Sequence, residues 1–302
     1  MKRLLVLGAA LAACLAVPLA SSAAAPSTTV CPQDTQAFSG SASTLVVPAG
    51  GYCAVTNASV ALDLVLQDGA GADLENVTIG RDLTGGEDAG AGIFDTTIGR
   101  NLSLRGGDGG ADLGGVKIGD DYLLADGAGT HMERTTIAHD FVATEPSTVQ
   151  TGKIAPDSPG GPVTVGHDML INGSPADNPF VFDGICDLHV GHDMRVTNRS
   201  VTLGFGIASF GCIAFEGRPG NTIGHDLVVT GNTAVASPFG SSLRIGNNRV
   251  GHDLIFSGNT GNDPGTLVVT DNVVGHDLLC SNNSQSISVF GANVAGRLNT
   301  CG

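Results

Sequence analysis

The sequence is short of the residues on which sugar-cleaving enzymes and nucleic-acid-binding proteins depend. It has no Trp, 2 Tyr and 14% charged residues in a chain of 302. The scarcity of aromatic side chains disfavours a stacking platform for sugar rings, and with it a polysaccharide-cleaving enzyme. Basic residues are also few, with 14 Lys and Arg against 29 Asp and Glu and a formal net charge of −15. We therefore expect no nucleic-acid partner, because both surfaces would be negative.

Long apolar runs are absent except at the N-terminus, so no membrane span is predicted. Met1–Leu11 has the basic and apolar regions of a secretory signal peptide. We expect cleavage after Ala23, which assigns residues 1–23 to the signal and predicts a secreted, extracellular protein. An alternative stays open, because Leu11–Cys14 is similar to a bacterial lipobox and would leave the protein lipid-anchored at Cys14.

Glycine is abundant, with 45 residues, and it lies at the centre of a motif that recurs ten times. The clearest copy is Thr222–Leu227, in which an apolar residue precedes Gly, His, Asp and Leu. Successive copies are 19, 20, 19, 28, 25, 33, 27, 24 and 20 residues apart. Repeats of this length predict a solenoid with one supersecondary unit per copy. The central positions are Gly80, Gly99, Gly119, Ala138, Gly166, Gly191, Gly224, Gly251, Gly275 and Ala295.

Around the motif, apolar residues alternate with polar ones over short runs, and asparagine recurs at two fixed places. This pattern is typical of short strands joined by tight turns, and no segment has a sustained helical period. The predicted fold is therefore all-β, a single-domain parallel β-solenoid of about ten coils. We assign residues 61–302 to the repeat domain and residues 24–60 to an N-terminal cap. The recurring asparagines are Asn221, Asn248 and Asn272, and Asn232, Asn259 and Asn283.

On Gly224–Leu227, Gly251–Leu254 and Gly275–Leu278, which are similar to Val-Gly-x-Asn/Asp-Leu steps with Asn at the turns, the chain resembles secreted right-handed parallel β-helix repeat proteins of high-GC bacteria. The resemblance covers about residues 60–302. It implies the fold and no particular activity, since β-helices carry lyases, hydrolases, adhesins and plain scaffolds.

The Gly-His-Asp steps predict a row of histidines and a parallel row of aspartates, spaced like paired strands at about 4.8 Å. We interpret these rows as structural, with each Asp accepting from turn amides and each His beside it. A Zn²⁺ or Cu²⁺ site is the alternative, although no metal is predicted. The rows consist of His139, His167, His192, His225, His252 and His276, with Asp140, Asp168, Asp193, Asp226, Asp253 and Asp277.

Longer spacings in the middle and later coils predict insertions at one corner of the solenoid, which would project along one edge. These segments carry six of the 11 Phe. We predict an apolar strip there, rimmed by charge, on which a glycan or protein partner docks; the alternative is that the rings only pin the loops to the wall. The strip and rim are Phe180, Phe205, Phe210, Phe239, Asp177, Asp183, Glu216 and Arg218.

Two further patterns bear on cofactors and stability. Gly106–Leu113 is similar to the calcium-binding nonapeptide of RTX proteins, so calcium is the one cofactor left open. Six cysteines remain once Cys14 leaves with the signal, and an even number in an exported chain predicts disulfides. Separations close to one coil predict the pairs Cys31–Cys53, Cys186–Cys212 and Cys280–Cys301.

These observations favour an exported β-solenoid that acts as a binding scaffold of the cell surface or extracellular matrix, with a glycan or another envelope component as ligand. No catalytic residue is predicted. Two other classes stay open: a polysaccharide lyase or glycoside hydrolase built on a β-helix, and a calcium-dependent structural protein. Nothing in the sequence fixes an oligomeric state.

Overall fold

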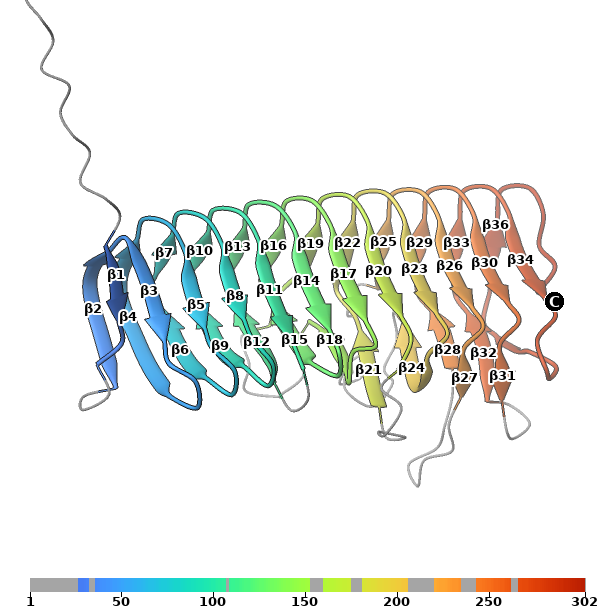
Figure 1. The fold of residues 1–302 in the computed structure, drawn as a ribbon. Helices are drawn as coiled ribbons and strands as arrows, with labels where there is room; N and C mark the ends of the chain where they lie inside the picture. Colours follow the sequence, from blue (N-terminus) through green and yellow to red (C-terminus); the bar gives the residue numbers. More distant parts are fainter. Residues whose placement is uncertain are drawn as a thin grey trace, which may run out of the picture.

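The computed structural model describes residues 27–32, 36–106, 109–152, 160–174, 181–205, 220–234, 243–261 and 266–301. These residues form a parallel β-solenoid of about 11 turns, which confirms the predicted all-β fold. The turns stack along one axis from the N-terminus, in blue, to the C-terminus, in red (Figure 1). No helix in these ranges is long and apolar enough to cross a membrane. The predicted signal peptide lies outside the described residues.

Three stacks of parallel strands, which we name faces A, B and C, make up the wall. Face A is a 12-stranded sheet that follows the Gly-His-Asp turn, and its strands pair one turn to the next. Its members are β1 (Thr28–Val30), β3 (Thr44–Val47), β5 (Leu64–Leu66), β8 (Leu83–Gly85), β11 (Leu102–Arg105), β14 (Tyr122–Ala125), β17 (Phe141–Thr144), β20 (Met169–Asn172), β23 (Met194–Thr197), β26 (Leu227–Thr230), β30 (Leu254–Ser257) and β34 (Leu278–Ser281).

Face B follows face A in each turn. Its strands are β2 (Ala37–Ala42), β4 (Tyr52–Val60), β6 (Gly71–Glu75), β9 (Gly90–Phe94), β12 (Gly110–Gly114), β15 (Gly129–Glu133), β18 (Val149–Thr151), β21 (Val181–Ile185), β24 (Ser200–Phe205), β28 (Leu243–Gly246), β32 (Leu267–Thr270) and β35 (Ser288–Phe290). Two short strands, β27 (Thr233–Ala234) and β31 (Thr260–Gly261), continue the start of β24 into the next turns.

Face C is built from two- and three-residue strands that end at the motif glycine. They are β7 (Thr78–Ile79), β10 (Thr97–Ile98), β13 (Lys117–Ile118), β16 (Thr136–Ile137), β19 (Val163–Val165), β22 (Leu188–Val190), β25 (Thr222–Ile223), β29 (Arg249–Val250), β33 (Val273–Val274) and β36 (Val294–Ala295). The long strand β4 belongs to both faces, because it pairs with β6 through Tyr52–Thr56 and with β7 through Ser59–Val60.

The core is a set of stacked aliphatic rows, one from each inward position of the three faces. In the motif, Ile223 before the glycine and Leu227 after the aspartate are 1% and 0% exposed. Each such side chain contributes about 1.5–3 kcal/mol by leaving water. The period-two pattern therefore holds the fold together turn by turn, which is why it could be found in the sequence.

The motif glycine sits where consecutive backbones come closest. A Cβ on Gly224 would lie 2.1 Å from the carbonyl oxygen of Gly191, so this corner selects the smallest residues. The same contact identifies a copy that the sequence analysis missed: a Cβ on Gly80 would lie 2.2 Å from the oxygen of Ala61, in Val60–Leu64. This additional copy explains why the turns number about 11 rather than ten.

The register of the last copy also differs from the prediction by one residue. Val274 pairs with Ala295, and a Cβ on Gly296 would lie 2.1 Å from the Gly275 oxygen. Gly296, not Ala295, therefore takes the glycine position, and the final spacing is 21 residues instead of 20. Two adjacent small residues made both alignments sterically acceptable, and strand pairing decides between them.

The N-terminal segment joins the same sheets as the repeats. Strand β1 pairs with β3 and β3 with β5, while β2 pairs with β4. Its role as a cap remains a prediction.

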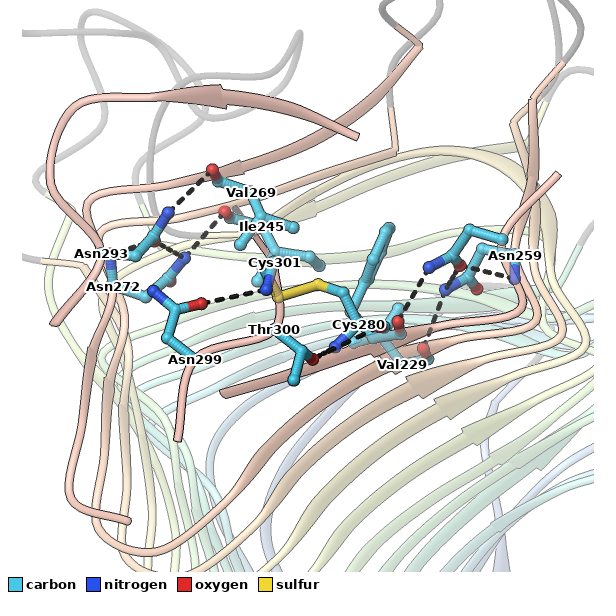
Figure 2. The surroundings of a disulfide bond; sticks show 12 residues. Val229, Ile245, Asn259, Val269, Asn272, Cys280, Asn293, Asn299, Thr300 and Cys301 are labelled. Carbon is cyan, nitrogen blue, oxygen red and sulfur yellow. Dashed lines mark hydrogen bonds between the residues drawn. A yellow bond between two sulfur atoms is a disulfide. The ribbon is translucent and has the colours of Figure 1, made fainter. Parts of the chain in front are cut away.

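The terminal disulfides are confirmed. Cys31–Cys53 and Cys280–Cys301 join residues with Cα atoms 6.2 and 4.9 Å apart, one at each end of the solenoid. Figure 2 shows the second bond beside Thr300, whose hydroxyl accepts from the Cys280 N–H at 2.8 Å. Cys186 is also disulfide-bonded. Its predicted partner, Cys212, lies outside the described residues.

The insertions occur at three places in the turn, which corrects the prediction of one corner. Residues 153–159 and 206–219 connect face B to face C, between β18 and β19 and between β24 and β25. Residues 175–180 connect face A to face B, between β20 and β21, whereas 235–242 and 262–265 interrupt face B, between β27 and β28 and between β31 and β32. The last coils, which have the clearest register, insert only within face B, so extrapolation from them concealed the other two places.

Candidate functional site

Most of the predicted docking strip falls outside the described residues. This applies to Phe180, Phe210, Phe239, Asp177, Glu216 and Arg218. Phe205 is the last residue of β24, where it pairs with Ile185. The strip therefore stays a prediction.

Asp183 is inside the wall rather than at the rim of a strip. Its carboxylate is 0% exposed and accepts from Arg199 Nε at 3.0 Å and Nη2 at 2.9 Å. The Arg199 guanidinium is also fully buried, and its Nη1 donates to the Pro146 oxygen at 2.6 Å and the Gly173 oxygen at 2.5 Å. This pair ties neighbouring turns together. Position in a loop-rich stretch suggested a surface acid, but the inward register of β21 buries it.

The structure brings the six motif histidines and their aspartates into two adjacent rows at the corner between faces C and A. From Asp140 to Asp253, each Asp Oδ1 accepts from the backbone N–H of the next Asp in the row and lies next to the next His. At the end of the row, Asp277 Oδ1 accepts from the Leu298 N–H at 3.1 Å and from Arg297 Nε at 3.0 Å. For Asp193 Oδ1 these partners are Asp226 N at 3.1 Å and His225 Nδ1 at 3.0 Å. Arg195 Nη2 donates to the other Asp193 oxygen at 2.9 Å.

These contacts lower the pKa of Asp193. Although partial burial acts to raise this pKa, hydrogen bonds from Arg195, the Asp226 N–H and His225 lower it to about 2. The pKa of His192 is raised, chiefly by its hydrogen bond to Asp168.

The imidazole rings of consecutive turns are stacked face to face. Consecutive ring centroids are 5.2, 5.0, 4.9, 4.7 and 4.6 Å apart, and no two neighbouring planes differ by more than 11°. In the first turns arginine takes the histidine position, and Arg81 Nε lies 3.4 Å from Asp63. Arg81, Arg100 and the six histidines therefore each place a donor near the preceding aspartate, whereas Asp120, in the same position of its turn, does not.

A different kind of site lies on face B of the early turns, over β6, β9, β12, β15 and β18. There a hollow of about 550 Å³ opens on the outer surface of the sheet. Strand pairing sets one row of outward residues across it, Asp73, Gly92, Asp112, His131 and Gln150. We call this hollow the face B groove.

Two exposed aromatic rings belong to this surface. Phe94 lines the face B groove, and Tyr52 lies beside it. Tyr52 is 40% exposed and Phe94 is 44% exposed. A Cβ on Gly71 would lie 3.3 Å from the Tyr52 ring, and one on Gly114 would lie 2.8 Å from the Phe94 ring. Glycine at these strand positions leaves room for each ring to lie against the sheet.

Polar groups converge on the same surface. The Tyr52 hydroxyl donates a short hydrogen bond to Asp73 Oδ2, which raises the pKa of the tyrosine. His131 lies 3.3 Å from Glu133 Oε1 and 4.0 Å from Asp112 Oδ1. The Asp112 carboxylate is 73% exposed, so it is open to a ligand in the groove.

A second hollow, of about 610 Å³, lies on face A near Asp68 and Arg105. It has no aromatic lining residue, and Asp68 Oδ1 already accepts from the Glu87 N–H at 3.1 Å. That carboxylate behaves as a turn acceptor, as expected for Asp in glycine-rich turns. The face B groove is thus the richer site chemically.

The sequence analysis did not identify the face B groove, because its residues are 19–20 positions apart and share no motif. One signal was present: Gly90 and Gly92, and likewise Gly110 and Gly114, lie within single strands, where glycine marks a close approach.

Fold and sites define a parallel β-solenoid with a ladder of histidines and aspartates and, on face B of the early turns, an open groove. Comparisons with protein-family models, with curated proteins and with solved structures found no match.

Proposed function

We propose that the protein is an exported β-solenoid scaffold that binds a glycan in the face B groove. The observation that carries this proposal is the exposed Phe94 ring on a glycine floor beside Asp73 and Asp112, with the exposed Tyr52 ring hydrogen-bonded to Asp73. Aromatic faces pack against the apolar faces of sugar rings, and carboxylates accept hydrogen bonds from sugar hydroxyls. An open groove along stacked strands suits an extended chain.

The charge of the groove narrows the ligand class. Asp73 and Asp112 line the hollow, and Glu133 lies against His131 at its edge. A polyuronate would meet like charge there, whereas a neutral or amino sugar would not. We therefore favour a neutral or basic glycan, which also disfavours a polyuronate lyase.

Hydrolysis is the second candidate, supported by one feature of the register. Asp73 and Asp112 flank Gly92 on strands two steps apart, roughly 9.6 Å at the backbone. Inverting glycosidases hold their two carboxyl groups about 6.5–9.5 Å apart, with room for a water molecule. Appearance of new reducing ends on a bound glycan would identify this activity, and an unchanged glycan would leave the scaffold function.

A glycan array probed with the mature protein, with and without Ca²⁺, tests binding and the calcium alternative together. For the glycan that binds, Phe94→Ala and Asp112→Asn should each raise Kd about tenfold, or about 1.4 kcal/mol. Leu123→Ala and Asp120→Asn are matched controls, since both positions are exposed outside the groove and should leave Kd unchanged. Absence of any bound glycan, or equal losses in the controls, would refute the proposal.

A further inference from the structure

The histidine row presents a chemical feature that neither fold nor glycan binding requires. Each ladder imidazole keeps its Nδ1 at 2.9–3.0 Å from the Oδ1 of the preceding aspartate. A carboxylate is an acceptor only, so in the neutral ring the proton stays on Nδ1 and Nε2 carries a lone pair. The ladder side chains are 34–54% exposed. The row therefore offers six solvent-facing Nε2 atoms.

This is the arrangement found around histidine ligands of metal ions. Such a histidine donates its other ring N–H to a carboxylate, which fixes the tautomer and orients the ring. Here every carboxylate is itself held by the backbone N–H of the following turn, as in Asp226 Oδ1 with Asp253 N at 3.0 Å. The supporting contacts are thus already in place before any ion binds.

The spacing sets how many rings can share one ion. Two nitrogens bound to one tetrahedral ion at about 2.0–2.1 Å lie about 3.3–3.4 Å apart. Neighbouring ring centroids are 4.6–5.2 Å apart, so Nε2 atoms of adjacent turns need to approach by roughly 1–2 Å. Rings two turns apart are too distant. His252 and His276 are the closest pair, at 4.6 Å, with planes already tilted by 11°.

We propose that adjacent ladder histidines bind a divalent first-row transition ion in pairs through Nε2, with water completing the coordination. Six histidines in one row then hold three ions. Imidazole nitrogen favours Cu²⁺, Ni²⁺ and Zn²⁺, with Cu²⁺ bound most tightly. The formal net charge of −15 adds a general attraction for cations. This inference is independent of the face B groove.

Two double variants with the same number of histidines separate pairwise binding from independent binding. His192→Asn/His225→Asn leaves two adjacent pairs, His139 with His167 and His252 with His276. His167→Asn/His252→Asn leaves one adjacent pair, His192 with His225. Isothermal titration with Cu²⁺ should give three tight sites in the wild type, two in the first variant and one in the second.

His189→Asn serves as the control, because His189 is an exposed residue of face C outside the row, and it should retain three sites. Circular dichroism establishes that each variant is folded. Equal capacity in the two double variants would overturn the proposal, since it would mean independent single histidines or general binding to acidic surface. For the diamagnetic ion Zn²⁺, ¹⁵N spectra should show the ladder Nε2 resonances shifting; a shift confined to Nδ1 would overturn the assigned ligand atom.

Discussion

The early and late turns of this solenoid stack in the same way but use different side chains at their corners and on face B. From β5 to β17 the turns take 19–20 residues, arginine or aspartate often stands beside the aspartate row, and face B is lined with glycine. From β23 to β34 the turns are longer, histidine fills the corner, and buried asparagines link successive turns. The late turns therefore place polar ladders at buried corners, whereas the early turns carry an open hollow on face B.

The asparagine ladders show how the late turns satisfy their buried corners. Asn259 Nδ2 donates to the Val229 oxygen at 3.0 Å and to Asn283 Oδ1 at 3.2 Å, as Figure 2 shows for Asn259 and Val229. Its Oδ1 accepts from the Asn232 N–H at 3.0 Å. In an early turn, at the corner between faces B and C, Asn76 Nδ2 donates to Asn57 Oδ1 at 2.7 Å, and this bond is exposed. Burial therefore makes the late ladder the more costly one to interrupt.

The largest effect is expected at the buried ion pair. Arg199→Met should destabilise the protein by about 3–5 kcal/mol, because it leaves the Asp183 carboxylate buried without its partner. Urea unfolding of the mature protein measures this. The early-turn counterpart is Arg134→Met, since Arg134 lies 3.8 Å from Asp95 with side chains 43% and 67% exposed. That change should cost less than about 1 kcal/mol. Similar costs for the two variants would contradict the contrast between regions.

Interrupting the asparagine ladder should have the next largest effect. Asn259→Ala should cost about 3 kcal/mol, because it leaves the Val229 oxygen and the Asn232 N–H without their Asn259 partner in a buried corner. Asn76→Ala, at an exposed asparagine of an early turn, should cost less than about 1 kcal/mol. Thermal unfolding of both variants provides the comparison, and an equal drop in Tm would show that burial does not distinguish them.

The aspartate row should matter more than the histidine row for stability. Asp226→Ala should cost about 1–3 kcal/mol, because its Oδ1 accepts from both the Asp253 N–H and His252 Nδ1. His225→Asn should change the free energy of unfolding by less than about 0.5 kcal/mol, since arginine already replaces histidine at Arg81 and Arg100. A larger loss for His225→Asn than for Asp226→Ala would reverse the roles assigned to the two rows.

The sequence predicted those features of the fold that recur from turn to turn or depend on the length of a single turn. The apolar residues around Gly224, the turn asparagines and the one-turn spacing of Cys280 and Cys301 each recur or depend on one turn length, so composition and spacing reveal them. Asp183 could not be placed, because a carboxylate in a loop-rich stretch gives no sign of the inward register that brings it to Arg199. The face B groove was missed for the opposite reason. Asp73 and Asp112 become neighbours only through the pairing of β6, β9 and β12.

The most direct test of ligand recognition in the early turns compares two variants for one array-selected glycan. Phe94→Ala/Asp112→Asn alters the face B groove, and Phe180→Ala/Phe210→Ala/Phe239→Ala alters the docking strip predicted in the later loops. With both variants folded, titration calorimetry should show Kd rising at least about tenfold in the groove variant and unchanged in the strip variant. The reverse pattern, full affinity without the groove side chains and loss without the three phenylalanines, would place recognition in the later loops and contradict the proposed site.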